Sequence, residues 1–294
     1  MVDFDPKRDS GRKLFYGLFI FPLLIAVGMA VLLCTVVLLT GEAETPESLI
    51  TAIKTGSPSK RWQKAFELSN ELNQGRGMIR TSGVMKEVIH ILKNRKEYDA
   101  RTRSYMAMAL SRFGDPEVIP ALRDALREET ETDVKLYLIW ALGVKQAKES
   151  TAEIVPFLQS SEQELQKMAA YVLGSLQDPK AALALEPLLQ SEVQDVRWNA
   201  ALSLARLGSP AAYDELLKMT DRKTLASYPG MTENKIEQIM VNAVKALGLL
   251  KKKESVSLLV DLADHDKSLK VREAAMQALK YQNESFQPLK ELAA

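Results

Sequence analysis

A repeated helical register constrains the fold of this 294-residue chain more than any other feature of its sequence. Seven segments align on one reference position, which is occupied by Arg61, Thr102, Val134, Leu165, Val196, Ile239 and Val271. A small or apolar residue follows four places later in each segment, and a leucine follows eight places later in all but the first. Spacings of four and eight residues place these side chains on one face of a helix. Each segment is therefore predicted to form a helix that buries this stripe.

A second helix is predicted after each of these. Its mark is the motif x-Pro-x-Leu, which occurs around Pro120, Pro156 and Pro187, with a weaker copy at Pro288. Proline is tolerated in a first helical turn because its missing N–H has no intrahelical partner there. Asp133 and Asp195 stand where their side chains could cap the first helix of their own repeats.

The helix-pair pattern resembles the HEAT repeat, in particular the short bacterial subtype that is also found in phycocyanobilin lyases. The resemblance covers residues 59–294 and implies an all-α solenoid of six to seven helix pairs. The composition agrees, because alanine and leucine dominate the apolar residues and aromatic residues make up only 6%. Stacked helix pairs leave a long, gently curved surface, which suits protein partners better than small substrates.

An uncharged segment from Leu14 to Thr40 precedes the repeats. As a helix it would be roughly 40 Å long, enough to span a bilayer core of about 30 Å. The alternative is a cleaved signal peptide, but the apolar part of such a peptide is usually only about 7–15 residues long. The sequence therefore predicts a short tail over residues 1–13, a transmembrane helix over 14–40, a linker over 41–58 and the repeat domain over 59–294.

The flanking charges predict the orientation of this span. Four basic residues precede it, namely Lys7, Arg8, Arg12 and Lys13. The charged residues that follow it up to residue 60 are Glu42, Glu44 and Glu47, with only Lys54 and Lys60 as basic residues. Because basic residues favour the cytoplasmic side, the N-terminus is predicted in the cytoplasm and the repeat domain in the periplasm or an equivalent compartment.

Small residues recur every fourth position within the span, at Ala26, Ala30 and Cys34. Such a stripe allows two membrane helices to approach closely, but an alanine- and leucine-rich span also produces this spacing by chance. Cys34 is the only cysteine, so a disulfide within one chain is excluded. A lipoprotein anchor at Cys34 is disfavoured because Leu33, rather than a small residue, precedes it.

A basic residue follows the reference position in four repeats, at Arg103, Lys135, Arg197 and Arg272. Two interpretations remain open. These side chains could form a positive ladder for an acidic partner, or they could pair with acidic or carbonyl groups of the adjacent repeat. The three tryptophans share no register, which indicates packing roles rather than an aromatic stripe.

Two inserts interrupt the repeat period. The first, residues 73–84, contains Arg76 and Arg80, and the second, residues 221–234, contains Tyr228 and Pro229. Inserts in solenoids map to loops and often lie on the binding face. They are candidate protein-recognition loops, with tolerated length variation as the alternative.

The sequence offers little for chemistry. Its two histidines, His90 and His265, lack the His-Glu pairing used by metal hydroxylases built on HEAT repeats, and no nucleotide-binding or hydrolase motif occurs. We therefore expect no catalytic, cofactor or metal site. Basic and acidic residues nearly cancel to a net charge of +1, which disfavours a nucleic-acid partner. The predicted function is a membrane-anchored scaffold or adaptor for protein partners, and the alternative is a bilin-lyase-like or other enzyme.

Overall fold

The computed structural model describes residues 16–40, 45–74 and 82–286, and these residues form helices joined by turns. The chain divides into two compact units, residues 1–48 and residues 49–294. The first unit contains the apolar segment, and the second contains the repeats.

The apolar segment is helical throughout its described length. A short π-helical turn, η1 (Tyr16–Ile20), leads into α2 (Phe21–Thr40). Residues Tyr16–Thr35 have a mean hydropathy of 2.6, and none of them is buried. This is one helix that is long and apolar enough to cross a membrane, although a signal sequence near an N-terminus meets the same two criteria.

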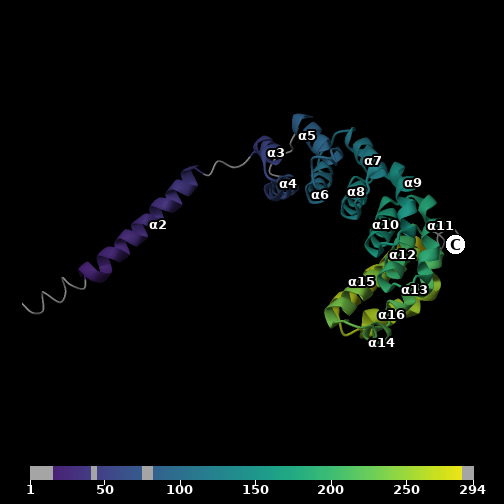
Figure 1. Ribbon diagram of the computed structural model, residues 1–294. Coiled ribbons are helices and arrows are strands. Elements are labelled where there is room, and N and C mark those ends of the chain that lie inside the picture. Colours follow the sequence, from purple (N-terminus) through teal and green to yellow (C-terminus); the bar gives the residue numbers. More distant parts are fainter. Residues whose placement is uncertain (1–15, 41–44, 75–81, 287–294) are drawn as a thin grey trace, which may run out of the picture. The chain divides into compact units, whose positions relative to one another are not determined.

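The repeats form a curved solenoid with an inner and an outer layer of helices (Figure 1). The inner helices are α4 (Pro58–Asn73), α6 (Ala100–Leu110), α8 (Thr132–Val144), α10 (Gln163–Leu176), α12 (Gln194–Arg206), α15 (Glu233–Leu250) and α17 (Leu269–Phe286). Each inner helix packs against the next one along the chain. The fold is therefore the predicted all-α solenoid of helix pairs.

The outer layer is less regular. It consists of α3 (Pro46–Thr55), α5 (Ser82–Lys93), α7 (Val118–Glu128), η2 (Lys148–Ser150), α9 (Thr151–Ile154), η3 (Val155–Gln159), η4 (Pro179–Ala181), α11 (Ala182–Leu185), η5 (Glu186–Gln190), η6 (Pro210–Ala212), α13 (Tyr213–Lys218), η7 (Lys253–Ser255) and α16 (Val256–His265). One further short helix, α14 (Arg222–Ala226), lies in the second insert.

Helix α3 lies where the sequence analysis places a linker. Leu49, Ile50 and Ile53 are buried in the solenoid unit, and Lys54 forms an ion pair of 3.0 Å with Glu87 of α5. The buried residues follow the i, i+1, i+4 spacing of one helix face. The repeats thus begin with an outer helix that precedes the first predicted inner helix.

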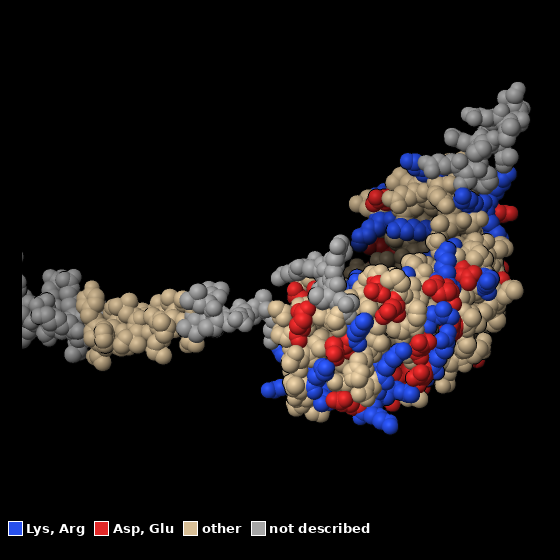
Figure 2. Space-filling model, turned by 90° about the horizontal axis from the view of Figure 1, so that it is seen from above, with Lys and Arg blue, Asp and Glu red and all other residues tan. Residues whose placement is uncertain are grey.

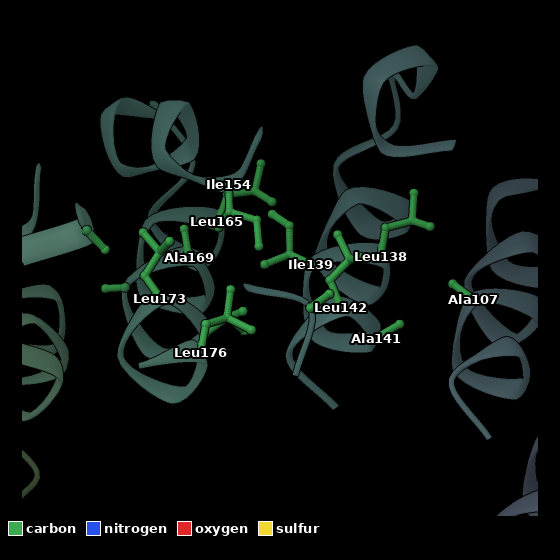
Figure 3. Close-up of a cluster of buried hydrophobic side chains, with 14 of the residues drawn as sticks. Ala107, Leu138, Ile139, Ala141, Leu142, Ile154, Leu165, Ala169, Leu173 and Leu176 are labelled. Atoms are coloured by element: carbon green, nitrogen blue, oxygen red, sulfur yellow. The ribbon is translucent and has the colours of Figure 1, made fainter. Parts of the chain in front are cut away.

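The predicted stripe forms the core. The residues four places after the reference, from Ala65 in α4 to Ala275 in α17, are fully buried. Figure 3 shows how Leu138 and Leu142 of α8 and Leu165, Ala169 and Leu173 of α10 turn into the space between the layers and between neighbouring helices. Burial of such side chains contributes about 1.5–3 kcal/mol each for the larger ones.

Two local predictions need correction. Asp133 and Asp195 lie inside the first turns of α8 and α12 rather than at their caps, where their charges favour the helix dipole. Pro156 and Pro187 lie in the first turns of the 3₁₀ helices η3 and η5, which follow α9 and α11, and so do not open α-helices. Proline cannot donate the i→i−4 hydrogen bond, so the α-helical pattern stops there.

Candidate functional site

A groove of about 1070 Å³ crosses four successive inner helices, α6, α8, α10 and α12, on the inner side of the solenoid. Its lining residues occupy repeated positions, which lie one place before the reference position and two, three and six places after it. Spacings of three, four and seven residues describe one helix face, and this face lies roughly opposite the buried stripe. The repeat register therefore places equivalent side chains of successive repeats along one groove.

Aromatic and sulfur-containing side chains dominate the positions three and six places after the reference. We call this lining the aromatic groove; its members are Tyr105, Met108, Tyr137, Trp140, Met168 and Tyr171. Three of the four inner helices contribute to it, α6, α8 and α10.

The aromatic rings form a continuous series along the groove. The ring of Phe66 from α4 meets Tyr105 edge-on with centroids 5.3 Å apart, and Tyr105 lies 6.5 Å from Tyr137. Phe66 and Tyr171 expose 44% and 46% of their surface. The three tryptophans alone do not indicate this surface, because they share no register. The surface becomes visible in the sequence when tyrosines are included at the positions three and six places after the reference.

Charged residues border the aromatic groove at the beginning of each inner helix. The position before the reference is Arg101 in α6 and acidic in the next three helices, as Asp133, Glu164 and Asp195. Lys167 is the other charged residue of the lining. The lining thus carries three acidic and two basic groups. Elsewhere, over the broad part of the solenoid in Figure 2, basic and acidic side chains are interspersed.

Arg103, the first member of the predicted basic ladder, is buried with only 3% of its surface exposed. Its guanidinium is paired with the buried carboxylate of Glu129, in the turn after α7, and donates to the carbonyl of Tyr98 at 3.2 Å. Arg103 therefore joins an inner helix to the outer layer and offers no surface to a partner.

The carboxylate of Glu129 is held in its charged form. Burial raises its pKa. Hydrogen bonds from the backbone N–H of Glu131, from the Arg103 guanidinium and from the backbone N–H of Thr130 lower the pKa by more than burial raises it, so the net pKa is below its usual range. A buried ion pair with these additional donors satisfies the condition under which burying charge is tolerated.

The remaining ladder residues are half-buried. Arg197 donates to the carbonyls of Ser191 at 2.6 Å and Glu192 at 3.1 Å, and lies 3.5 Å from Glu215 of α13. Lys135 borders a small cavity beside Glu129, and Arg272 lies on α17. The structure does not bring the four ladder residues together on one open surface.

The bonds of these arginines also place the first repeat in register. Arg103 and Arg197 each donate to a carbonyl five residues earlier, and Arg61 does the same to Gly56 at 2.9 Å. Arg61 is therefore equivalent to Arg103, one place after the reference position. With this shift of one residue, Leu68 occupies the place eight after the reference, which the first segment otherwise lacks, and the buried Ala65 moves from the fourth place to the fifth.

The second insert packs against the body of the solenoid. Tyr228 meets Trp198 of α12 edge-on with centroids 5.8 Å apart, while Pro229 is exposed. Tyr228 and Arg197 line a common polar cavity of about 540 Å³. Of the predicted site residues, these two are brought together; Arg76 and Arg80 lie outside the described residues.

Comparison with known families decides what these helix pairs are. The sequence profile of HEAT repeats matches residues 46–143 and 151–227, which is more than half of the chain. The chain belongs to the HEAT-repeat family. The first matched stretch begins at α3, so the HEAT repeats pair each outer helix with the inner helix that follows it.

The chain is similar to several solved structures at low sequence identity. A chain of the complex of CpcE and CpcF of phycocyanin lyase from Nostoc sp. PCC7120 is 16% identical, with 81% of this chain and 94% of that chain covered and a TM-score of 0.53. An engineered protein is 20% identical over 81% of this chain and 96% of its own, with a TM-score of 0.38. Human deoxyhypusine hydroxylase is 16% identical over 81% and 84%, with a TM-score of 0.33. No curated protein matches the chain.

The histidines of the HEAT repeats lie on exposed surface. His265 and Asp261 are 3.2 Å apart on α16, both largely exposed, and His90 is exposed near the end of α5. Within the described part of the chain, no three His, Cys, Asp or Glu side chains gather in a way that could hold a metal ion.

Proposed function

We propose that this HEAT-repeat chain is a membrane-anchored scaffold that binds a protein partner in the aromatic groove. The observation that carries the proposal is the groove lined by half-buried Tyr105, Tyr137 and Trp140 and exposed Tyr171 across α6, α8 and α10. The rings of Phe66, Tyr105 and Tyr137 follow one another along it. Tyrosine, tryptophan and methionine are enriched at the centres of protein interfaces.

The regular helices of the inner layer also favour this groove as the binding surface. The groove residues lie on continuous helices of 11–14 residues whose other face is buried. Binding residues on packed helices keep their geometry without a partner, so less conformational entropy is lost on association.

The proposed anchor is the apolar helix of the first unit. Residues Tyr16–Thr35 meet the length and hydropathy of a membrane span. Lys7, Arg8, Arg12 and Lys13 favour a cytoplasmic N-terminus, which places the HEAT repeats on the opposite side. A reporter fused after Ala294 is then active only if it functions in the exported compartment. Extraction of the chain by alkaline carbonate would show instead that it is not inserted in the membrane.

The binding proposal is tested by site-specific crosslinking in native membranes. A photoreactive amino acid at Tyr171 in the groove is expected to yield a discrete adduct with one partner. The matched control carries the same amino acid at Leu183 of α11, which is 80% exposed on the outer layer. A third variant at Pro229 samples the second insert.

Adducts from Leu183 or Pro229 alone would contradict the proposal. The double variant Tyr137→Ala, Tyr171→Ala should melt like the wild type. In pull-downs it should no longer capture the partner that is crosslinked from position 171. Retention of a bilin pigment by the purified chain, seen as visible absorbance, would instead favour the bilin-lyase-like alternative.

A further inference from the structure

Lys167 forms a bridge between two neighbouring repeats inside the groove. It lies two places after the reference position of α10, and its Nζ is 2.6 Å from Glu164 on the same helix and 3.9 Å from Asp195 on α12. The Lys167 side chain exposes 22% of its surface, while Glu164 and Asp195 expose 70% and 61% of theirs. One cation thus lies between two carboxylates that occupy equivalent positions of successive helices.

One repeat earlier an equivalent pair of carboxylates has no lysine of its own, and its Glu164 is the carboxylate that already pairs with Lys167. Asp133 and Glu164 occupy the equivalent positions of α8 and α10, and the place that corresponds to Lys167 is Leu136. Among the residues that the structure describes, Asp133 forms no ion pair or side-chain hydrogen bond, and Arg101, one repeat further back, lies over the ring of Trp62 at 3.5 Å. The groove therefore has an acidic border at this repeat with an apolar floor.

The aromatic walls next to this place suit a basic side chain. Tyr137, Trp140 and Tyr171 line the groove, and the faces of aromatic rings attract guanidinium and ammonium groups. The chain uses such contacts itself, since Arg206 lies 5.3 Å from the ring centroid of Tyr171.

We propose that the partner segment that occupies the aromatic groove carries a lysine or arginine whose cation lies between Asp133 and Glu164, with apolar residues on either side of it in contact with Leu136, Met108 and Met168. This inference rests on the proposed function and names the class of partner: a protein segment with a basic residue inside an apolar stretch. The charge complementarity disfavours an acidic segment, because an acidic side chain there would face the Asp133 carboxylate, which has no cation among the described residues.

The test uses the full chain in detergent micelles and synthetic fluorescein-labelled peptides as probes. All peptides share a frame of leucine and tyrosine around one central residue, which is lysine, arginine, norleucine or glutamate. The lysine and arginine peptides are expected to bind about two- to fivefold more tightly than the norleucine peptide, the range expected of partly exposed charge pairs. The difference should shrink as salt is raised.

Two variants locate the cation. Asp133→Asn should remove the preference for lysine over norleucine. Leu136→Lys should remove it as well, because the new lysine places an ammonium group of the chain itself where Lys167 places one in the next repeat. The matched controls are Asp264→Asn on α16 and Leu183→Lys on α11, both exposed on the outer layer, and both should leave the preference unchanged.

The outcomes separate the two proposals. Equal binding of the lysine and norleucine peptides, or binding of neither, overturns the inference. If Tyr137→Ala still abolishes partner capture in that case, the groove remains the binding site, and only the inference that the partner carries a basic residue is wrong. If Tyr137→Ala and Tyr171→Ala together leave partner capture intact, the proposed function fails as well.

Discussion

The inner and outer layers of this solenoid solve the same packing problem in different ways. The inner helices α8, α10 and α12 are continuous and hold the repeat register, whereas the outer segments around Pro156 and Pro187 change from α-helix to 3₁₀ helix within a few residues. The outer layer thus absorbs prolines and inserts, while the inner layer keeps its spacing. Variation in the sequence of a repeat therefore has different consequences in the two layers.

Close approach between inner helices explains why their register is strict. A Cβ added to Gly174 of α10 would lie 2.4 Å from the side chain of Ser203 on α12, and one added to Gly248 of α15 would lie 2.9 Å from Ala278 on α17. These glycines occupy the same place, nine after the reference, and meet the residue seven after the reference of the next helix. The groove side chains inherit this regular spacing.

The largest expected effect follows from placing a charge in the inner layer. Ala200→Arg on α12 puts a guanidinium where the native side chain is fully buried. An unpaired buried charge costs several kcal/mol, so the melting temperature should fall strongly. Leu183→Arg on the exposed outer surface of α11 should change it little. Equal melting temperatures for the two variants would show that the layers do not differ in this way.

A slightly smaller effect is expected where the two layers are joined. Arg103→Ala leaves the buried Glu129 carboxylate without its partner, and breaking such a pair costs about 3–5 kcal/mol. The control is Lys270→Ala, which removes an exposed partner of Glu237 and should cost about 0–1 kcal/mol. Chemical denaturation gives both free energies of unfolding. A similar loss in the two variants would mean that the Arg103 pair contributes no more than a surface one.

The same contrast between layers explains what could be predicted from the sequence. The buried stripe was predictable because Ala169, Ala200 and Ala243 recur at helical spacing inside long continuous helices. Helix α3 was not, because its buried residues fall outside the repeat period that starts at the first inner helix.

The directions in which the long basic side chains point could not be predicted from the sequence either. A basic residue at one repeated position is compatible with an open ladder or with bonds to backbone carbonyls, and only the structure shows that Arg103 and Arg197 do the latter. The aromatic groove, in contrast, was within reach of the sequence, since Tyr105 and Tyr137 share one register position and Trp140 and Tyr171 share another.

Close packing within the inner layer gives a third, intermediate effect. Gly174→Ala forces the helices apart, because the added Cβ would also lie 2.6 Å from the Cα of Ser203. Overpacking of this kind costs about 1–3 kcal/mol. Gly114, in an outer turn, has open space around its Cα and no positive φ, so Gly114→Ala is the matched control and should be nearly neutral. Thermal melting of both variants sharpens the comparison, and a neutral Gly174→Ala would show that the inner spacing can relax.

The smallest effect is expected from mild acid, and it reports on the links between the layers. The pKa of Glu129 is lowered in the folded chain, since the hydrogen bonds from Glu131, Arg103 and Thr130 outweigh its burial. The pKa of Asp266 is lowered in the same way. Burial raises it, but hydrogen bonds from the Arg222 guanidinium, at 2.6 Å, and from the backbone N–H of Ser268 lower it by more. A carboxylate with a lowered folded pKa stabilises the fold above its unfolded pKa of about 4, and this contribution is lost as the pH falls through the folded value.

Melting curves should therefore be flat between neutral pH and about pH 5 and should shift to lower temperature below about pH 4. The sharper measurement is the difference between the wild type and Glu129→Gln. This difference should be largest near neutral pH, where the wild-type carboxylate is charged beside Arg103, and should close as the pH falls and the carboxyl group takes up its proton. A difference that stays constant into strong acid would mean that the charge of Glu129 does not join the layers, and that hydrogen bonding and packing alone hold the turn after α7 to α6.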